Sequence, residues 1–279
     1  MKVLVTGANS GIGYATALGL AKTGATVILA CRNRNRDRGK AAVAEIVAST
    51  GNENLHLMIC DLSSQESIRG LAEDVQTKFS SLDVLINNAA IFAPTRVESV
   101  DGIELQIATN YLGTFLLTNL LLDRLNAGKA SRIINISTAN HFFATLELED
   151  LQSKVNYEPK TAHIQSKLAI VFFTFELAAR LAEVNTTVNC LCPGVTATNL
   201  LGQFRNIPVE ERFSPQMGGA PLEEGARTPL YLALSSDVNG ISGQYFENCK
   251  SVASSPESHD KDKAVALWRA SERLVARPG

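Results

Sequence analysis

The sequence predicts an α/β fold of the doubly wound type, in which a mostly parallel sheet is covered by helices on both faces. Short apolar runs without polar alternation recur along the chain, as expected for strands that are buried on both faces. A stretch with helical periodicity follows most of these runs, and repeated βα units with right-handed crossovers build one parallel sheet. The first run ends in a glycine-rich turn at residues 6–13.

Size and composition describe one large globular domain. The chain has 279 residues, 45% of them hydrophobic, and a net charge of -2, which argues against a nucleic-acid binder and a disordered chain. The cysteines lack zinc-ligand spacing, so no metal site is predicted. We expect reduced, buried thiols in a cytoplasmic protein, at positions 31, 60, 190, 192 and 249.

No membrane-spanning segment is predicted. The longest apolar run, residues 111–122, is broken by polar residues and glycine and is too short to span a bilayer. The first residues already have the pattern of a core strand, so no signal peptide is predicted, and no membrane anchor is expected unless a longer native protein was truncated.

Strands and helices alternate in order along residues 1–250. After the first strand at residues 3–5, further strands are expected at 26–31, 55–60, 82–86, 132–136, 187–191 and 242–246. Helices are expected at 15–22, 39–50, 66–78, 102–125, 162–182 and 223–235, with a loop of low periodicity before residue 161.

The tail, residues 251–279, is predicted to be a helical extension that packs on the same domain. Ser254–Glu257 has the pattern of a helix entrance, and Leu267, Trp268, Leu274 and Val275 could form an apolar stripe.

The glycine-rich turn has the composition of a phosphate-binding loop. Gly7 allows unusual dihedral angles, Gly11 lets a phosphate approach the backbone, and Gly13 lets the helix pack close to the strand. Free N–H groups and the dipole at the helix start favour a pyrophosphate. The predicted binding residues are Gly7, Asn9, Ser10, Gly11, Ile12 and Gly13.

This Thr-Gly-x-x-x-Gly-x-Gly pattern resembles the loop of the short-chain dehydrogenase/reductase family. The resemblance covers about residues 2–247 and is nearest to the retinol-dehydrogenase-like branch, on residues 30–33, 165–169 and 245–246. It implies an oxidoreductase with a Rossmann fold and a nicotinamide cofactor. The expected sheet has about seven strands in the order 3-2-1-4-5-6-7.

Arginines after the second strand favour NADP(H). NAD-selective enzymes place an acid there for the ribose 2′-hydroxyl, whereas NADP-selective enzymes use arginine for the 2′-phosphate. Arg32 supplies a planar guanidinium, and the two residues before it supply no acid. Arg38 is the second choice for the phosphate, and Arg34 and Arg36 are interpreted as solvated loop residues.

Three further motifs resemble family elements around the cofactor. One follows the third strand and would bind the adenine edge, and the second is an Asn-Asn-Ala-Ala turn after the fourth strand. The third is a Pro-Gly-x-x-x-Thr loop beside the nicotinamide carboxamide. The implied residues are Asp61, Leu62, Asn88, Ala89, Pro193, Gly194 and Thr198.

Four residues are predicted to form the catalytic group. The resemblance implies that Asn110 props a backbone bend, Ser137 holds the substrate oxygen, and Lys167 binds the ribose. The family's Tyr-x-x-x-Lys element here reads His163 to Lys167, so an imidazole stands where the family has a phenol. The i, i+4 spacing puts both side chains on one helix face.

Three interpretations of His163 stay open. In the first interpretation, His163 is a substitute acid–base, because histidine titrates near neutrality. A nearby lysine disfavours the imidazolium form. Alternatively, the chain binds its cofactor with little or no turnover, as a sensor or scaffold or for non-redox chemistry. In the third interpretation, His163 is an engineered or incidental change in an ordinary reductase. Tyr157, six residues upstream, is a weaker alternative proton carrier.

Loop aromatics predict an apolar alcohol or carbonyl substrate. Together with the motifs, they indicate an NADP(H)-dependent oxidoreductase that interconverts the two; a cofactor-binding protein is the alternative. No nucleic-acid partner is predicted, and the oligomeric state stays open, a homo-oligomer included. The apolar residues concerned are Phe92, Phe142, Phe143, Phe204 and Met217.

Overall fold

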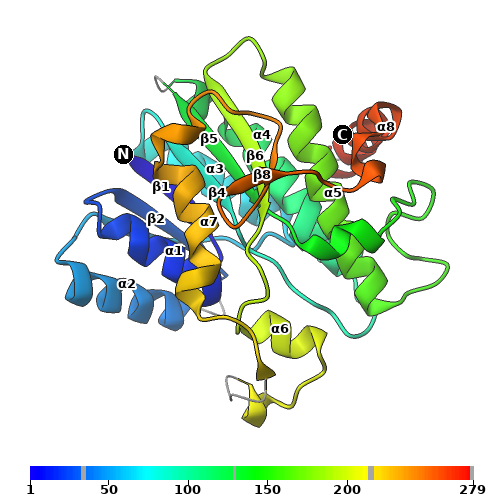
Figure 1. The fold of residues 1–279 in the computed structure, drawn as a ribbon, viewed down its shortest axis with the longest axis horizontal. Coiled ribbons are helices and arrows are strands. Elements are labelled where there is room, and N and C mark those ends of the chain that lie inside the picture. Colours follow the sequence, from blue (N-terminus) through cyan, green and yellow to red (C-terminus); the bar gives the residue numbers. More distant parts are fainter. Residues whose placement is uncertain (33–35, 128–129, 213–216, 277–279) are drawn as a thin grey trace.

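The computed structural model describes residues 1–32, 36–127, 130–212 and 217–276 (Figure 1). Its strands form one sheet in the order β3-β2-β1-β4-β5-β6-β7-β8. Seven strands are parallel, and β8 pairs antiparallel with β7. The strands are β1 (Lys2–Thr6), β2 (Thr26–Cys31), β3 (Leu55–Ile59), β4 (Val84–Asn87), β5 (Ser131–Ile136), β6 (Thr186–Cys192), β7 (Tyr245–Glu247) and β8 (Lys250–Val252).

Helices follow the parallel strands in the expected alternation. The α-helices are α1 (Gly11–Ala21), α2 (Arg36–Thr50), α3 (Gln65–Lys78), α4 (Gly113–Asn126), α5 (Pro159–Arg180), α6 (Asn199–Phe204), α7 (Leu222–Leu234) and α8 (Lys261–Val275). The short 3-10 and π segments are η2 (Ile107–Leu112), η3 (Ala139–Phe143), η4 (Val209–Glu211), η6 (Ser236–Val238) and η7 (Pro256–His259).

Two apolar layers cover the sheet. Alternate residues of β1 point to opposite faces, so Leu4 belongs to one cluster and Val3 and Val5 to the other. The Leu4 face is covered by α3, α4 and α5, and the other face by α1, α2 and α7 (Figure 1). Both faces of the sheet are therefore covered by helices, and the predicted doubly wound sheet is confirmed.

The strand order agrees with the prediction, and one strand was missed. After β7 the chain reverses through Asn248 and Cys249, whose φ angles are 48° and 62°, and returns as β8. Only three residues long and exposed, β8 has no apolar pattern that could have indicated it. The expected domain boundary at residue 250 coincides with the first residue of this strand.

The predicted long helix at 102–125 is interrupted by a π turn. Residues of η2 precede α4, and the Gly113 N–H donates to the Ala108 carbonyl, five residues back. Gly113 is required here, because a Cβ would lie 2.4 Å from the Leu62 carbonyl oxygen. The π turn carries Asn110, and such turns are frequent at functional sites.

The tail ends in α8, which packs on α5. Trp268 lies in an aromatic cluster with Phe115 and Phe173, at ring distances of 4.9 and 5.9 Å. The Ser271 hydroxyl and the buried Tyr111 hydroxyl are 2.7 Å apart. These contacts tie the last helix to the core beneath it.

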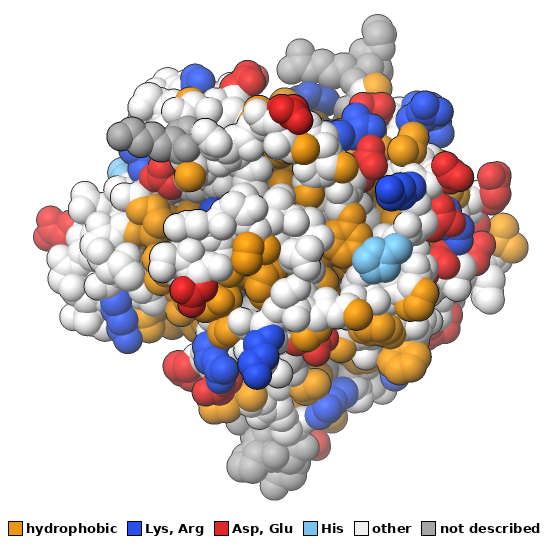
Figure 2. Space-filling view, turned by 45° about the horizontal axis from the view of Figure 1, so that its top comes forward, with side chains coloured by type: hydrophobic (Ala, Val, Ile, Leu, Met, Phe, Trp, Pro, Cys, Tyr) orange, Lys and Arg blue, Asp and Glu red, His pale blue; other side chains and the backbone are white. Residues whose placement is uncertain are grey.

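The molecular surface carries charges of both signs. On the face in Figure 2, acidic and basic side chains lie mainly around a more apolar middle, without a large patch of one sign. Among the helices in the described ranges, none combines the length and the apolar character that crossing a bilayer requires.

Candidate active site

The glycine loop lies between β1 and α1, at the carboxyl edge of the sheet. Gly7 and Gly11 have φ angles of 67° and 57°, which favour glycine. A Cβ on Gly13 would lie 2.4 Å from both the Gly7 carbonyl oxygen and Asn88 Nδ2. Each of these glycines therefore has a steric reason, and the loop stays tight against the end of β4.

The start of α1 fits a pyrophosphate. Ser10 occupies the N-cap without a side-chain hydrogen bond to the helix, and no acidic residue lies in the first turn. The first N–H groups of the helix therefore remain for an anion, next to Asn9 and Ile12. Thr198 lies close by, since its methyl carbon would be 3.4 Å from a Cβ on Gly11.

Thr6 fastens this loop to the turn after β4. Its hydroxyl oxygen accepts hydrogen bonds from the Asn88 and Ala89 N–H groups, each at 3.0 Å, and Asn88 Nδ2 donates to the Thr6 carbonyl at 2.8 Å. The predicted residues of the first and fourth strand ends are thus brought together.

The remaining cofactor candidates follow the carboxyl ends of β3 and β6. Asp61 follows β3 and accepts hydrogen bonds from the Ser63 N–H and hydroxyl through Oδ1. Leu62 is buried, and its carbonyl faces Gly113. Pro193 and Gly194 follow β6, where Gly194 has a φ of 77°.

Arg32 directly follows β2 and is half-buried. Arg36 and Arg38 lie in the first turn of α2 and are exposed. Arg34 lies outside the described residues. Arg32 is thus the arginine nearest to the end of β2 in the described part of the chain.

Asn110 organises the centre of the site through the backbone of Ile91. Its Oδ1 accepts from the Ile91 N–H at 2.8 Å, and its Nδ2 donates to the Ile91 carbonyl at 3.1 Å and to Ser166 Oγ at 3.0 Å. The same carbonyl lies 3.2 Å from Nδ1 of His163. Two predicted residues therefore meet at one carbonyl group.

This contact defines the protonation of His163. A carbonyl only accepts hydrogen bonds, so Nδ1 carries the proton and Nε2 of the neutral ring is left as an acceptor. Nε2 has no hydrogen-bond partner in the described part of the chain. Burial and then the Lys167 charge lower the pKa of His163 to about 3, against the Ile91 hydrogen bond, so the ring is neutral at physiological pH.

Two phenylalanines enclose the imidazole. The ring centroids of Phe92 and Phe204 lie 5.9 and 5.7 Å from that of His163, and 5.5 Å from each other. Lys160 lies over Phe204, 5.4 Å from its centroid. The buried His163 ring thus sits in an apolar cage formed by Phe92 and Phe204.

Lys167 and Ser137 lie deeper. Lys167 Nζ donates to the Ile136 carbonyl at 2.9 Å, and burial lowers the pKa of this amine to about 8. The Ser137 hydroxyl donates to the Lys167 carbonyl at 2.8 Å. With its proton engaged, Ser137 can offer a ligand only lone pairs.

Sequence reasoning missed Thr138 and His141. Thr138 is half-buried, and its Oγ1 accepts from the Asn140 N–H at 3.3 Å, which leaves the hydroxyl proton available. The pair of hydroxyl residues at the strand end could have indicated it. His141 lies in a stretch without clear periodicity, and nothing in the sequence signalled its burial.

Tyr157 is tied to the scaffold. Its hydroxyl donates to the Ala93 carbonyl at 2.7 Å and accepts from Gln106 Nε2 at 2.8 Å. The Glu104 carboxylate accepts from the Gln106 and Ile107 N–H groups close by. These bonds engage the phenol, which argues against Tyr157 as a substitute proton carrier.

The other apolar residues that were predicted to line the substrate site differ in their exposure. Met217 is buried, whereas Phe142 and Phe143 are exposed, Phe143 to 83%. Phe92 and Phe204 are thus the two that line the histidine.

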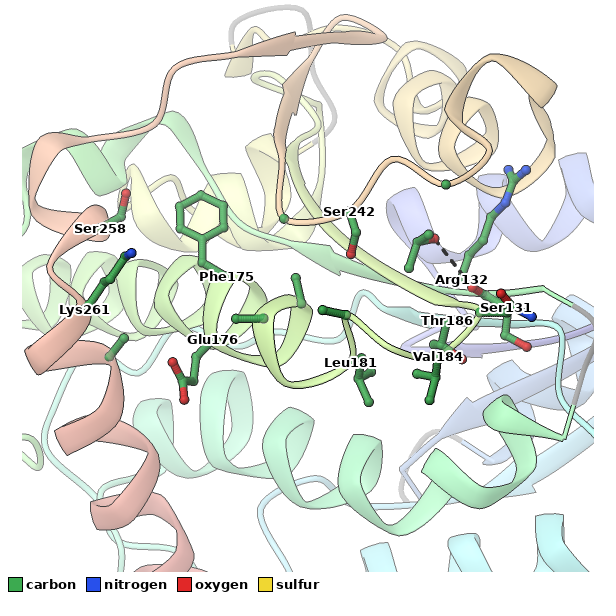
Figure 3. A pocket seen from close by; sticks show the side chains of 18 of the residues that line it. Ser131, Arg132, Phe175, Glu176, Leu181, Val184, Thr186, Ser242, Ser258 and Lys261 are labelled. Atoms are coloured by element: carbon green, nitrogen blue, oxygen red, sulfur yellow. Dashed lines mark hydrogen bonds between the residues drawn. The ribbon is translucent and has the colours of Figure 1, made fainter.

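A large groove lies at the opposite, amino edge of the sheet (Figure 3). It has a volume of about 1010 Å³ and is lined by the starts of β5 and β6, the end of α5 and the start of α8. Arg132 and Lys261 are balanced by Glu176 and Asp260 along its walls. None of the predicted site residues lines it.

Comparison with known proteins gives one family. A family model described as short chain dehydrogenase matches residues 1–207. Retinol dehydrogenase 13 of Mus musculus is 41% identical over 289 residues, which cover 98% of this chain and 83% of the relative. Polyprenol dehydrogenase of Homo sapiens is 37% identical over 275 residues, covering 95% and 82%.

The fold of this chain is also similar to those of solved structures. An uncharacterized protein from Mycobacterium paratuberculosis superposes with a TM-score of 0.79 at 35% identity, covering 98% of this chain and 92% of the other. A short chain dehydrogenase from Shigella flexneri, complexed with NADP, gives 0.69 at 25% identity, covering 88% and 95%.

Proposed function

Because the chain belongs to the short chain dehydrogenase family, we propose that it is an NADP(H)-dependent oxidoreductase that interconverts an apolar alcohol and its carbonyl compound, with alcohol oxidation as the favoured direction. His163, in place of the family's tyrosine, carries the second part of this proposal. Its Nδ1 proton is directed to the Ile91 carbonyl, so Nε2 is ready to accept a proton and has none to give.

In this oxidation, the substrate hydroxyl gives its proton to Nε2 of His163 as a hydride leaves the carbinol carbon. A bound nicotinamide dinucleotide supplies the hydride acceptor. The Thr138 hydroxyl donates to the substrate oxygen and stabilises the negative charge that develops there. Asn110 holds the carbonyl that fixes the His163 tautomer, and Lys167 binds the nicotinamide ribose.

Carbonyl reduction needs the opposite transfer. With the pKa of His163 lowered to about 3 by burial and by Lys167, the protonated ring is scarce near neutral pH. A carbonyl oxygen also meets the lone pair of Nε2 instead of a donor. Both effects favour an alcohol over a carbonyl compound as the ligand.

The preference for NADP(H) depends on Arg32, at the end of β2. The NADP complex of the Shigella flexneri relative supports this assignment. We expect Arg32→Ala to weaken NADPH binding by roughly 10–100-fold, the value of one or two charge-assisted hydrogen bonds, while NADH binding changes little. Arg36→Ala is the matched control, because Arg36 is exposed in the first turn of α2. Equal losses for both cofactors on titration would contradict the assignment.

The substrate class follows from the relatives and from the cage. Retinol and polyprenol, after which the two relatives are named, are long apolar alcohols, and Phe92 and Phe204 offer apolar contact beside His163. The test is turnover of retinol and a short polyprenol with NADP⁺ and with NAD⁺. Repeated turnover with NADP⁺ supports the proposal, and no turnover of any alcohol or carbonyl compound refutes it.

A second candidate is a protein that binds the dinucleotide without efficient redox turnover, as a sensor or scaffold. The low pKa of His163 favours it, because a general base works best when its pKa is near the operating pH. Tight NADPH binding by the unaltered chain, with substantial turnover only in His163→Tyr, would favour this function over the first.

A further inference from the structure

A C-terminal segment contacts the loop that carries the Thr138 hydroxyl, through His141. The His141 side chain is completely buried in η3. Its Nδ1 lies 2.7 Å from the Thr138 carbonyl, and its Nε2 accepts from the Ser255 backbone N–H at 3.0 Å. Since the carbonyl only accepts, Nδ1 carries the proton, and the neutral ring has both nitrogens satisfied.

Two aromatic side chains pack against the His141 ring. Its centroid lies 4.5 Å from that of Phe142 and 4.8 Å from that of Tyr245 in β7. A second link runs beside it, where Glu257 Oε1 accepts from the Leu146 N–H at 3.2 Å. The segment at residues 254–258 thus touches both ends of the loop at 138–146.

Hydrogen bonds and an ion pair also stabilise the segment at residues 254–258. Ser258 Oγ donates to the Ser255 carbonyl at 2.6 Å, and Ser254 Oγ lies 2.8 Å from Ser258 Oγ. Lys263 of α8 pairs with Glu257. The Ser255 N–H is therefore presented from a fixed turn, and α8 fastens that turn to α5.

We propose that His141 is a positioning residue for the Thr138 hydroxyl and that residues 254–258 form its anchor; this inference rests on the proposed oxidation. The hydrogen bonds run from the Ser255 N–H through the imidazole to the carbonyl of Thr138. If the ring turned away, the buried Ser255 N–H would be left unpaired, which is costly, while the Thr138 carbonyl would keep its hydrogen bond from the His141 backbone N–H at 3.2 Å. The C-terminal extension therefore contributes to the geometry of the active site.

Two variants break the hydrogen bonds from Ser255 through His141 to Thr138, and a third leaves them intact. Ser255→Pro removes the N–H, at a φ of -59° that proline adopts, and its ring displaces the imidazole. His141→Asn keeps a donor near Nδ1 but cannot reach Ser255. Ser255→Ala is the control, because it keeps the N–H and removes only a buried hydroxyl that has no hydrogen-bond partner among the described residues.

The readouts are hydrogen exchange of the amides at 138–144, kcat and KM for retinol oxidation, and the Kd of NADPH. We expect faster exchange and a roughly tenfold to hundredfold lower kcat in Ser255→Pro and His141→Asn, as for a misplaced catalytic group. The Kd of NADPH should stay unchanged, and Ser255→Ala should match the unaltered chain.

A purely structural role predicts lower thermal stability with unchanged kcat in the folded variants, and that result would overturn the proposal. Equal exchange in all variants would overturn it as well. If the unaltered chain oxidises no alcohol, the proposed function fails. The exchange difference between Ser255→Pro and Ser255→Ala then still decides whether the anchor holds this loop.

Discussion

Two buried histidines lie on the carboxyl side of the sheet and differ in one respect. His141 uses both ring nitrogens, one toward Thr138 and one toward Ser255. Within the described part of the chain, His163 uses only Nδ1, toward Ile91. Burial lowers the pKa of both rings, although the Thr138 bond and Glu247 oppose this at His141.

This difference in hydrogen bonding makes His141 a structural residue and His163 a candidate catalytic residue. A ring with both nitrogens engaged has fixed orientation and no capacity to exchange a proton with a ligand. A neutral ring with one nitrogen unused can accept a proton as soon as a substrate supplies one. Burial and residue type are the same in the two cases, so hydrogen-bond partners decide the role.

Replacing the His163 ring is expected to have the largest effect. His163→Phe keeps an aromatic ring in the cage with Phe92 and Phe204 but removes the proton acceptor, so alcohol oxidation should fall by about 10²–10⁴-fold. NADPH affinity should be retained. The measurement is kcat for retinol oxidation, with NADPH titration on the same sample.

His163→Tyr sharpens the same comparison. A phenol stays protonated near neutral pH, so this variant should shift the ratio of reduction to oxidation toward carbonyl reduction. If His163→Phe retains the full kcat across the pH range, the imidazole moves no proton and the distinction between the two histidines is lost.

The burial of neutral His163 should also lower the free energy of unfolding in acid. This effect is smaller than the effect on activity and independent of it. The folded-state pKa of His163, about 3, lies below the unfolded reference of about 6.5, so the unfolded chain binds more protons in acid. Stability from this group is complete above about pH 6.5 and is lost as the pH falls toward 3.

The loss from His163 should reach about 2 kcal/mol at about pH 5. In His163→Phe, the drop in unfolding free energy between about pH 7.5 and about pH 5 should be smaller by that amount, as measured by urea unfolding. His141→Gln should change in the same direction, since burial also lowers the pKa of His141. An unchanged pH dependence in His163→Phe would show that the ring is not buried as a neutral group.

Local patterns predicted the fold well. The apolar strands and the glycine loop follow from short-range constraints, whereas the sheet order was expected from the family resemblance that these motifs carry. The reversal at Asn248 and Cys249 could not, because it depends on two non-glycine residues with positive φ. The π turn at η2 likewise depends on close packing against Leu62.

The site was predictable in its residue types but not in its bonds. Asn110, His163 and Lys167 were found from their motifs, and their positions in the structure are adjacent. Asn110 and His163 share the backbone carbonyl of Ile91, and Lys167 donates to that of Ile136; such backbone partners have no signature in a sequence. The engagement of Ser137 with the Lys167 carbonyl, and the role of Ser255, arise from contacts between distant segments.

The most direct test is the protonation state of His163, read from the ¹⁵N chemical shifts of its imidazole. The chain has four histidines, and His163→Phe assigns the signal by its loss. We predict a neutral ring with the proton on Nδ1 and a bare Nε2, unchanged between about pH 8 and about pH 5. A ring that titrates near the reference value of about 6.5, or that carries its proton on Nε2, would contradict the assignment of His163 as a buried proton acceptor.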